Sequence, residues 1–373
     1  MTDGQPLQGA VIGCGRMGAF TSASVLKYGP ACWLPLAHAE AIANAEGVEL
    51  AALCDPDEAA RDRAAQHYGV SQTYPSHGAL LSAKAPDIAG IATRTPGRAQ
   101  MIADCVEAGT RALHIEKPIC NSVNELEQLE ELLARPDIFM TLGAIRRHFA
   151  IYQEAIIRAQ SGEFGALLEA HAQFGARSLF WSHPHTVDLI LLAANGARVQ
   201  AVQARLGNVE RDGSVVDNDP IVEGATIWFE SGFAGHITRM PGTDFRLACE
   251  TAQISVLNNG QSLWQSGREK PGPDTPPISD PAGANPYHDQ QQIDFSAGDK
   301  PQGTLAPILQ LRDCVLDADG ARAANRVVKH DIVTGQRILF AMVQSHLEDG
   351  RPVPLADVDP DIVVHGRTGQ FFA

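Results

Sequence analysis

Short apolar runs alternate with longer helical stretches through the first 145 residues. The apolar runs have the length of buried strands, and the stretches between them place apolar side chains on one helical face. The expected strands are residues 9–12, 49–54, 88–92, 112–115 and 139–142. The expected helices are residues 57–68, 100–108 and 122–134. This alternation predicts βαβ units, and therefore an α/β fold with a doubly wound parallel sheet.

The pattern changes at about residue 146. One helical stretch, residues 151–160, precedes longer strand-like runs. The strands expected there are residues 167–174, 199–206, 225–229, 234–238 and 245–256, and helices are expected at residues 304–317 and 331–347. We therefore predict a domain over residues 1–145 and a second, α+β domain over residues 146–373. The second domain has an antiparallel or mixed sheet with helices on one side.

Two segments depart from this regular pattern. Residues 29–38 precede the second expected strand, and their two prolines and Trp33 predict a loop or a broken helix. This segment either lies over a bound ligand or is a surface excursion. Residues 266–303 are rich in Pro, Gly, Asp and Gln and lack periodicity. A loop of that length inside a compact domain is usually functional or mobile.

The composition fits two globular domains in a chain of 373 residues, with 44% hydrophobic and 20% charged residues. No apolar run reaches the roughly 18 residues of a membrane span, and no signal peptide is visible. The seven cysteines are scattered and odd in number, which predicts reduced thiols and a cytoplasmic protein. The net charge of −15 argues against a nucleic-acid surface.

A glycine motif follows the first expected strand. Gly13, Gly15 and Gly18 have the G-x-G-x-x-G spacing that ends a strand and opens a helix. Gly13 permits the tight turn, Gly15 lets a pyrophosphate approach the backbone, and Gly18 lets the helix pack against the strand. The free N–H groups and the helix dipole then face two phosphates. This motif predicts dinucleotide binding, with Arg16 and Met17 in the same loop.

Two further strand ends carry candidate residues. Asp55 ends the second expected strand, where an acidic residue binds the adenosine ribose and favours NAD over NADP. Alternatively, Asp55 is only a turn residue before Pro56. Glu116 and Lys117 follow the strand at residues 112–115, and ligands gather at such carboxyl ends. By itself, a Lys-Pro pair is more often a solvated strand end.

Together and in this order, Gly13-x-Gly15-x-x-Gly18, Asp55 and Glu116-Lys117-Pro118 resemble the glucose-fructose oxidoreductase, inositol dehydrogenase and MocA (Gfo/Idh/MocA) family. The resemblance continues in Arg146-Arg147-His148-Phe149 and ends in His185-Thr186-Val187-Asp188, which matches the family's His-x-x-Asp. It implies an N-terminal Rossmann domain and a C-terminal domain whose large open sheet carries oligomerisation in many members. It also implies pyridine-nucleotide oxidation or reduction, mostly at a carbinol carbon of a sugar, polyol or related ring.

The sequence around His185 suits a catalytic role. Pro184 fits the first turn of a helix, with Ser182 or His183 as its cap. His185 and Asp188 then lie one turn apart, so that Asp188 orients the imidazole. His185 is the expected general base, because a histidine accepts and returns a proton near neutral pH.

One position departs from the family. Many sugar-oxidising members have an aspartate four residues before this histidine, and here that residue is Trp181. His183 is the nearest polar substitute, and Trp181 is expected to stack on an apolar sugar face. A zinc site from His183, His185 and Asp188 lacks cysteine or further histidine nearby, so no metal site is predicted.

The remaining candidates rest on the resemblance and on charge. The resemblance places Thr93, Thr95, Pro96 and Glu116 near the cofactor. Arg146, Arg147 and Arg177 are candidates for binding an anionic substrate, although structural salt bridges are the commoner use of arginine.

Three functions compete. The leading hypothesis is an NAD-dependent oxidoreductase acting on a sugar, sugar acid or cyclitol, with NADP the less favoured cofactor. In it, Lys117 positions the reacting oxygen and His185 moves the proton. The second is an NAD-dependent glycosidase or anhydro-sugar-converting enzyme that oxidises, eliminates and re-reduces without net NADH. The third is a non-catalytic nucleotide sensor, which the presence of Lys117 and His185 opposes. A homo-oligomer, either dimer or tetramer, is expected.

Overall fold

The computed structural model describes residues 5–267 and 290–366. Its N-terminal half contains a six-stranded parallel sheet in the order β3-β2-β1-β4-β5-β6. The strands are β1 (Leu7–Ile12), β2 (Val48–Cys54), β3 (Gln72–Tyr74), β4 (Ile88–Ile91), β5 (Ala112–Ile115) and β6 (Phe139–Leu142). The order reverses between β1 and β4, which is the topology of a Rossmann fold. The predicted doubly wound parallel sheet is confirmed.

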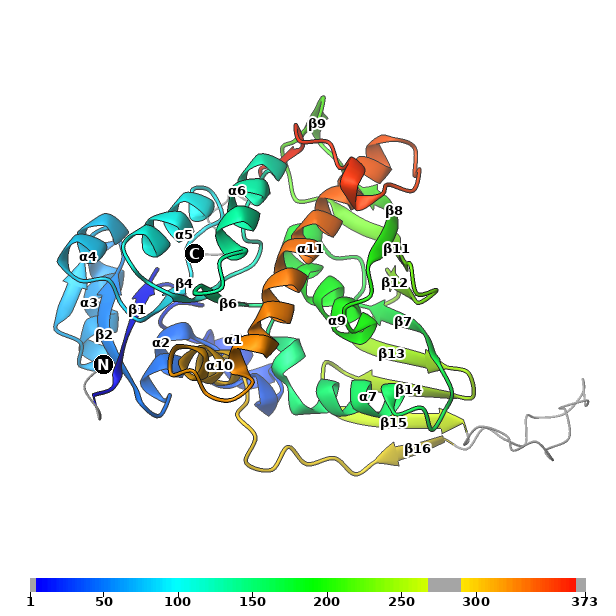
Figure 1. Cartoon of the computed structure of the whole chain (residues 1–373), viewed down its shortest axis with the longest axis horizontal. Helices are drawn as coiled ribbons and strands as arrows, with labels where there is room; N and C mark the ends of the chain where they lie inside the picture. Colours follow the sequence, from blue (N-terminus) through cyan, green and yellow to red (C-terminus); the bar gives the residue numbers. More distant parts are fainter. Residues whose placement is uncertain (1–4, 268–289, 367–373) are drawn as a thin grey trace, which may run out of the picture.

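Helices cover both faces of this sheet (Figure 1). One layer is formed by α4 (His77–Ala83), α5 (Arg98–Glu107) and α6 (Val123–Leu133). The other is formed by α2 (His38–Ala43), α3 (Glu58–Tyr68) and α10 (Leu305–Val315). Helix α10 comes from far along the chain, yet its apolar side chains share a core with β1, α2 and α3. The predicted division after residue 145 therefore omits a helix that completes the N-terminal core.

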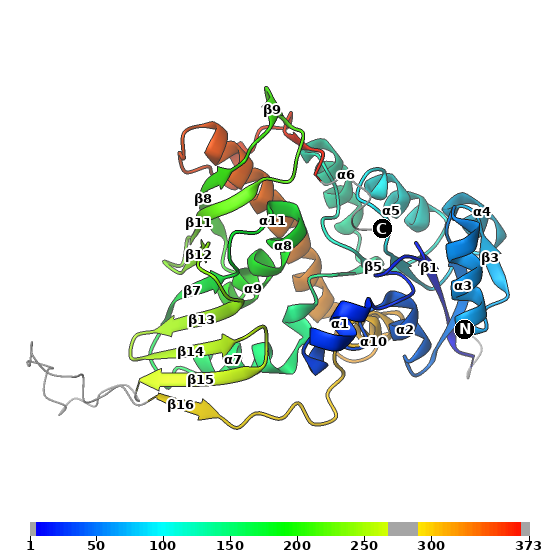
Figure 2. The same ribbon diagram turned by 180° about the vertical axis from the view of Figure 1, so that it is seen from behind.

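The first helix of the Rossmann fold is interrupted. The turn after the glycine motif gives way to a segment that contains α1 (Ala23–Tyr28) and the short helix η1 (Ala31–Trp33). The predicted broken helix at residues 29–38 corresponds to this region. After it, α2 resumes beside the first turn, because the His38 N–H donates to the Met17 carbonyl at 2.9 Å. In Figure 2, α1 lies between the two domains.

The second domain is built on an eight-stranded sheet with the order β16-β15-β14-β13-β7-β12-β11-β8. Its strands are β7 (Leu167–Gln173), β8 (Val199–Gly207), β11 (Ile221–Phe229), β12 (Ala234–Thr238), β13 (Asp244–Cys249), β14 (Ala252–Leu257), β15 (Ser262–Gly267) and β16 (Gln290–Ile293). The sheet is mixed, because β7 and β12 are parallel and the other neighbours are antiparallel. A small separate sheet joins β9 (Arg211–Asp212), β10 (Val215–Val216) and β17 (Val363–Val364).

Helices pack on one face of the eight-stranded sheet. They are α7 (Ala150–Gln160), α9 (Pro184–Ala194) and α11 (Ala321–Leu347), with the short helix α8 (Leu179–Ser182) before α9. Side chains of the opposite face stay partly exposed, such as Arg246 at 39% and Gln173. Seen from behind, strands β13 to β15 lie in front (Figure 2). The open sheet that the family resemblance implied is therefore present.

The long helix α11 joins the domains. It packs against β8 and α9 on one side and against β6 and α6 on the other. β6 is an edge strand, and the Asn325 side chain satisfies both backbone groups of its Met140. The Met140 N–H donates to Asn325 Oδ1 at 3.1 Å, and Asn325 Nδ2 donates to the Met140 carbonyl at 2.9 Å. This pairing protects an edge that otherwise exposes unpaired backbone groups.

Several elements differ from the sequence prediction. The run at residues 245–256 is two strands, because Glu250 and Thr251 turn the chain between β13 and β14. The last helix begins at Ala321, ten residues before the predicted start, and the sequence did not predict β3 or α4. β16 lies inside the predicted loop at residues 266–303, and residues 268–289 of that loop lie outside the described residues. No helix within the described ranges is long and apolar enough to cross a membrane.

The packing of α10 yields a stability prediction. Leu311 is fully buried in the N-terminal core, whereas Leu316, just after the same helix, is 54% exposed. We expect Leu311→Ala to lower the free energy of unfolding by about 2–5 kcal/mol, because it leaves a cavity in a packed core. Leu316→Ala is the matched control and should change stability by less than about 0.5 kcal/mol. Denaturant unfolding followed by circular dichroism checks both, and equal effects would contradict the assignment of α10 to this core.

Candidate active site

The glycine loop has the backbone that the motif predicts. Gly13 has φ of +100°, and a Cβ there would lie 2.8 Å from the Ala92 carbonyl oxygen. A Cβ on Gly18 would collide with the Gly13 carbonyl oxygen. In contrast, no atom lies within 4 Å of the Cβ position of Gly15. The loop is therefore closed on the protein side and open at Gly15, which fits the close approach of a pyrophosphate.

Asp55 lies beside this loop at the end of β2. Its Oδ2 accepts the Cys14 N–H at 2.6 Å, and its Oδ1 accepts the Asp57 N–H at 2.8 Å. The carboxylate thus helps to fix the loop backbone as well as the turn after β2. The turn role that the sequence left open is present, and the ribose role stays a prediction.

Lys117 follows β5 and reaches across to the second domain. Its Nζ donates to the Trp181 carbonyl at 2.7 Å and lies 3.9 Å from the centroid of the Trp181 ring. Burial lowers the pKa of Lys117 to about 8, and the Arg98 and Arg146 charges act in the same direction while Glu116 opposes them. The ammonium is therefore close to losing its proton at slightly alkaline pH.

Two residues to which the sequence assigned no role hold the Lys117 segment. Arg98 is buried, and its guanidinium donates to the carbonyls of Thr93, Glu116 and Pro118, which ties the ends of β4 and β5 together. The Arg98 side chain is thus a positioning group. Arg98 is the first residue of α5, separated from the end of β4 by six residues.

His38 is the second missed residue. Its Nε2 lies 3.3 Å from Glu116 Oε1, and its side chain is fully buried. Burial by itself would raise the pKa of Glu116, but the His38 hydrogen bond and nearby charges outweigh it and lower that pKa. Glu116 is therefore a buried carboxylate beneath Lys117, held by a histidine from α2.

The two histidines around α9 have different environments. His185 is partly buried, and its Nδ1 has no hydrogen-bond partner among the described residues. Burial, followed by the charges of Arg146 and Lys117, places the pKa of His185 well below its ordinary value. His185 is therefore a neutral imidazole near Lys117. Pro184 opens α9 as predicted.

His183 does not reach solvent. It occupies the N-cap position of α9, is 0% exposed, and its Nδ1 contacts Thr186 Oγ1 at 3.1 Å. Burial lowers its pKa to about 4. The hypotheses that His183 replaces the missing aspartate and binds substrate are wrong for this structure, because the ring has no accessible surface to offer a ligand.

Asp188 and Arg147 form a buried ion pair. Arg147 Nε lies 2.9 Å from Asp188 Oδ1, and Arg147 Nη2 lies 2.8 Å from Asp331 Oδ2 on α11. The prediction that Asp188 orients His185 is wrong, because its carboxylate is bound to Arg147. The prediction that Arg147 binds substrate is also wrong, because both ends of its guanidinium face protein carboxylates. The alternative zinc site of His183, His185 and Asp188 would lack the Asp188 ligand, because that carboxylate is paired with Arg147.

Arg146 faces the space between the domains. Its guanidinium donates to Asn259 Oδ1 at 2.8 and 3.1 Å and lies 5.0 Å from the Trp33 ring and 5.1 Å from the Phe174 ring. Arg177 is exposed, and its Nε donates to the Phe174 carbonyl. The segment at residues 29–38 thus contributes Trp33 to a wall beside Arg146, so it is more than a surface excursion.

A carboxylate missed in the sequence lies near Lys117. Asp219, in the turn before β11, accepts the N–H groups of Phe180 at 2.7 Å and Trp181 at 3.0 Å. It fixes the start of α8, and its charge also acts on Lys117. Trp181 itself is 40% exposed and stacks on Lys117, so its predicted contact with a sugar face remains untested.

The other predicted cofactor residues surround the glycine loop. Thr93, Thr95 and Pro96 follow β4, next to the Gly13 turn, and Arg16 and Met17 lie within the loop. Their contacts with a cofactor stay predictions.

Comparison with known proteins finds relatives of the N-terminal domain. A family model described as an oxidoreductase family with an NAD-binding Rossmann fold, GFO_IDH_MocA, matches residues 7–143. The match covers the glycine loop, Asp55 and Lys117. Residues 7–143 of this chain are therefore similar to the NAD-binding Rossmann domain of the Gfo/Idh/MocA oxidoreductases.

Curated relatives match only part of the chain. A D-apiose dehydrogenase of Paraburkholderia graminis is 32% identical over 111 residues, which is 30% of this chain and 25% of the relative. A glycosyl hydrolase family 109 protein of Shewanella sp. strain MR-4 is 35% identical over 147 residues, covering 37% and 32%. The chain thus spans a quarter to a third of the length of these relatives.

Solved structures share the whole fold. An inositol dehydrogenase homologue from Azotobacter vinelandii, crystallised with NADH and myo-inositol, superposes with a TM-score of 0.68. The superposition covers 94% of this chain and 98% of that chain at 16% identity. This similarity shows the fold of both domains.

The site also fits the cofactor of the Gfo/Idh/MocA family. Gly15 leaves the backbone open to a pyrophosphate, and Asp55 lies beside it where the adenosine ribose binds in this fold. Lys117, at the end of β5, belongs to the same edge of the sheet.

Replacing Asp55 tests its part in choosing the cofactor. Asp55→Asn keeps an oxygen for the Cys14 N–H but removes the charge that repels a 2′-phosphate. We expect the affinity for NADP to rise relative to NAD by about tenfold, about 1.4 kcal/mol. Titration calorimetry with both nucleotides measures the ratio. Asp57→Asn is the control, because the Asp57 side chain serves only as the N-cap of α3. A ratio of NADP to NAD affinity that is unchanged in Asp55→Asn would contradict the role of Asp55.

Proposed function

We propose that this protein is an NAD-dependent oxidoreductase that acts on a carbinol carbon of a sugar, sugar acid or cyclitol. The observation that carries the proposal is the meeting of Lys117 and neutral His185 between the domains, at the carboxyl edge of an NAD-binding fold. Bound NAD supplies the hydride acceptor for alcohol oxidation and, when reduced, the hydride donor. The partial matches to D-apiose dehydrogenase support a sugar-like substrate.

Each side chain has a defined task in this proposal. Lys117 donates a hydrogen bond to the reacting oxygen and stabilises the negative charge that develops on it. His185 accepts the hydroxyl proton, which it can do because its ring is neutral and its Nδ1 is unpaired. A buried base with a low pKa binds the proton weakly, so Lys117 must acidify the hydroxyl for the transfer to proceed.

Arg146 and Arg177 favour an anionic substrate. Arg146 is a buried cation that contacts the Asn259 amide, the Tyr152 side chain and two aromatic rings. A carboxylate-bearing sugar would form a charge-assisted pair with the Arg146 guanidinium. Arg177, which is exposed nearby, adds a second cation.

A second function has one observation in its favour, the similarity to glycosyl hydrolase family 109 proteins. A glycosidase of this kind would oxidise a ring carbon, expel a leaving group and return the hydride without net NADH. It requires a second base for the proton on the neighbouring carbon. Buried His183 cannot take that role, whereas Lys117, with a pKa of about 8, can.

Turnover of the purified protein separates these functions. Sugars, sugar acids, cyclitols and glycosides are incubated with NAD, the absorbance of NADH is followed, and products are analysed. Net NADH with an oxidised product supports the dehydrogenase. A product formed only with NAD present but without net NADH contradicts it and supports the glycosidase. His185→Asn should abolish turnover in either case while NAD binding persists.

The pH dependence tests Lys117. Burial lowers the pKa of Lys117 to about 8, so the ammonium is protonated below that pH and neutral above it. We expect kcat/KM for alcohol oxidation to fall as pH rises through this value. Lys117→Arg should be slower but flat over the same range, because arginine keeps its proton. Lys117→Met should lose about a hundredfold or more.

The comparison of the three pH profiles is decisive. A decline that persists unchanged in Lys117→Arg would mean that another group titrates, and the role of Lys117 would be wrong. The neutral His185 should produce no decline between pH 6.5 and 8, because burial holds its pKa well below the ordinary histidine value of 6.5.

A further inference from the structure

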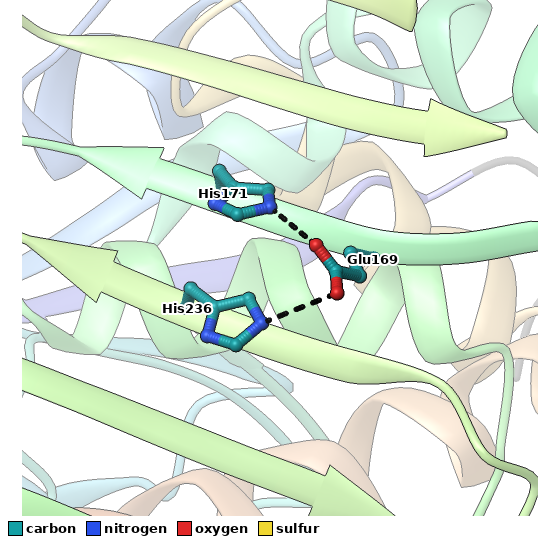
Figure 3. Close-up of side chains that lie close together, drawn as sticks. All are labelled: Glu169, His171 and His236. Carbon is teal, nitrogen blue, oxygen red and sulfur yellow. Dashed lines mark hydrogen bonds and ion pairs between the residues drawn. The ribbon is translucent and has the colours of Figure 1, made fainter. Parts of the chain in front are cut away.

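Two histidines and a glutamate meet on the open face of the eight-stranded sheet, away from Lys117. Glu169 and His171 lie two positions apart on β7, so both side chains project from the same face. His236 on β12 is the direct cross-strand neighbour of His171 in the register of these parallel strands. Figure 3 shows the three side chains gathered around the Glu169 carboxylate.

The distances between these groups are short. Glu169 Oε2 lies 2.8 Å from His171 Nε2, and Glu169 Oε1 lies 3.9 Å from His236 Nε2. The two imidazoles are stacked with centroids 4.7 Å apart and an interplanar angle of 26°. One nitrogen from each ring and one carboxylate oxygen all lie within 4.8 Å of one another.

Thr226 supplies an outer hydrogen bond. Its Oγ1, on the neighbouring strand β11, lies 3.3 Å from His236 Nδ1. A histidine that binds a metal usually donates its other N–H to such an acceptor, which fixes the tautomer and turns the free nitrogen toward the ion. Here that partner leaves His236 Nε2, the atom nearest Glu169, as the available ligand.

We propose that Glu169, His171 and His236 bind one divalent transition-metal ion of the zinc type. Two imidazoles and a carboxylate are a donor set that suits zinc, whereas magnesium and calcium prefer oxygen ligands. Tetrahedral zinc has ligands at about 2.0–2.2 Å, which places ligand atoms roughly 3.4 Å apart. The present spacing requires only small side-chain rotations. Water completes the coordination, because the three side chains are 26–46% exposed.

The metal would act as a clamp between β7 and β12. These strands occupy central positions in the sheet, and their pairing is parallel. A bound ion adds a link between them that the unfolded chain cannot form, so it stabilises the fold in proportion to its occupancy. The proposal is independent of the redox function, since it uses none of the residues near Lys117.

Zinc titration of the full chain tests the site. We expect one equivalent of Zn²⁺ by calorimetry and a higher melting temperature with zinc than with a chelator. His171→Ala and His236→Ala should weaken binding more than about tenfold and abolish the thermal shift. Thr226→Val should weaken it by about tenfold, because it removes only the outer hydrogen bond. His77→Ala is the matched control, because His77 is a partly exposed histidine paired with one carboxylate, Asp104.

Cobalt substitution distinguishes this site from the cysteines. Co²⁺ bound to histidine and carboxylate gives weak visible bands only, whereas thiolate ligation gives intense near-ultraviolet charge transfer. Weak bands that disappear in His171→Ala support the site. Thiolate bands, zinc binding that survives in both histidine variants, or no binding to the wild type would each overturn it.

Discussion

A buried arginine between two carboxylates holds the junction of the domains. Arg147, directly after the N-terminal sheet, bridges Asp188 on α9 and Asp331 on α11. Burial raises the pKa of Asp188 to about 6, with a smaller contribution from the Asp331 charge, while Arg147 opposes the shift. Removing one partner from such a group leaves an uncompensated buried charge, which costs about 3–5 kcal/mol. The position of His185 relative to Lys117 depends on this connection.

The environment of Lys117 shows how the site adapts to the residue at position 181. A tryptophan ring and a backbone carbonyl contact Lys117 where the family resemblance predicts a carboxylate. Both interactions favour the ammonium without adding a negative charge next to it. The remaining charges, Glu116 below and Asp219 at the start of α8, are held by His38 and by backbone N–H groups. The lysine is therefore positioned firmly while its pKa stays near 8.

Local patterns predicted the first domain well. The bounds of β5 and β6 and the roles of Gly13 and Gly18 follow from short-range sequence, because strand burial and turn geometry depend on near neighbours. Pairings between distant residues were not predictable. One turn of helix suggested that Asp188 serves His185, but Arg147 is the stronger partner for a carboxylate.

The same limit applies to α10 and to the open face of the second sheet. An amphipathic helix shows which face it buries but not which domain receives it. Glu169 and His236 are 67 residues apart and meet only because β7 and β12 pair in parallel with His171 opposite His236. No spacing in the sequence signals such a meeting.

The interrupted first helix has a modular construction. His38 and Ala39 donate to the carbonyls of Met17 and Gly18, so they occupy the helical positions that residues 21 and 22 would hold in an uninterrupted helix. Residues 21–37 are therefore an insertion into this helix. The residues that follow the insertion keep the helical positions that they would have without it. This insertion carries Trp33 to within 5.0 Å of the Arg146 guanidinium, so exchanging it would change the surroundings of Arg146. The glycine turn would keep its hydrogen bonds to the start of α2 in such an exchange.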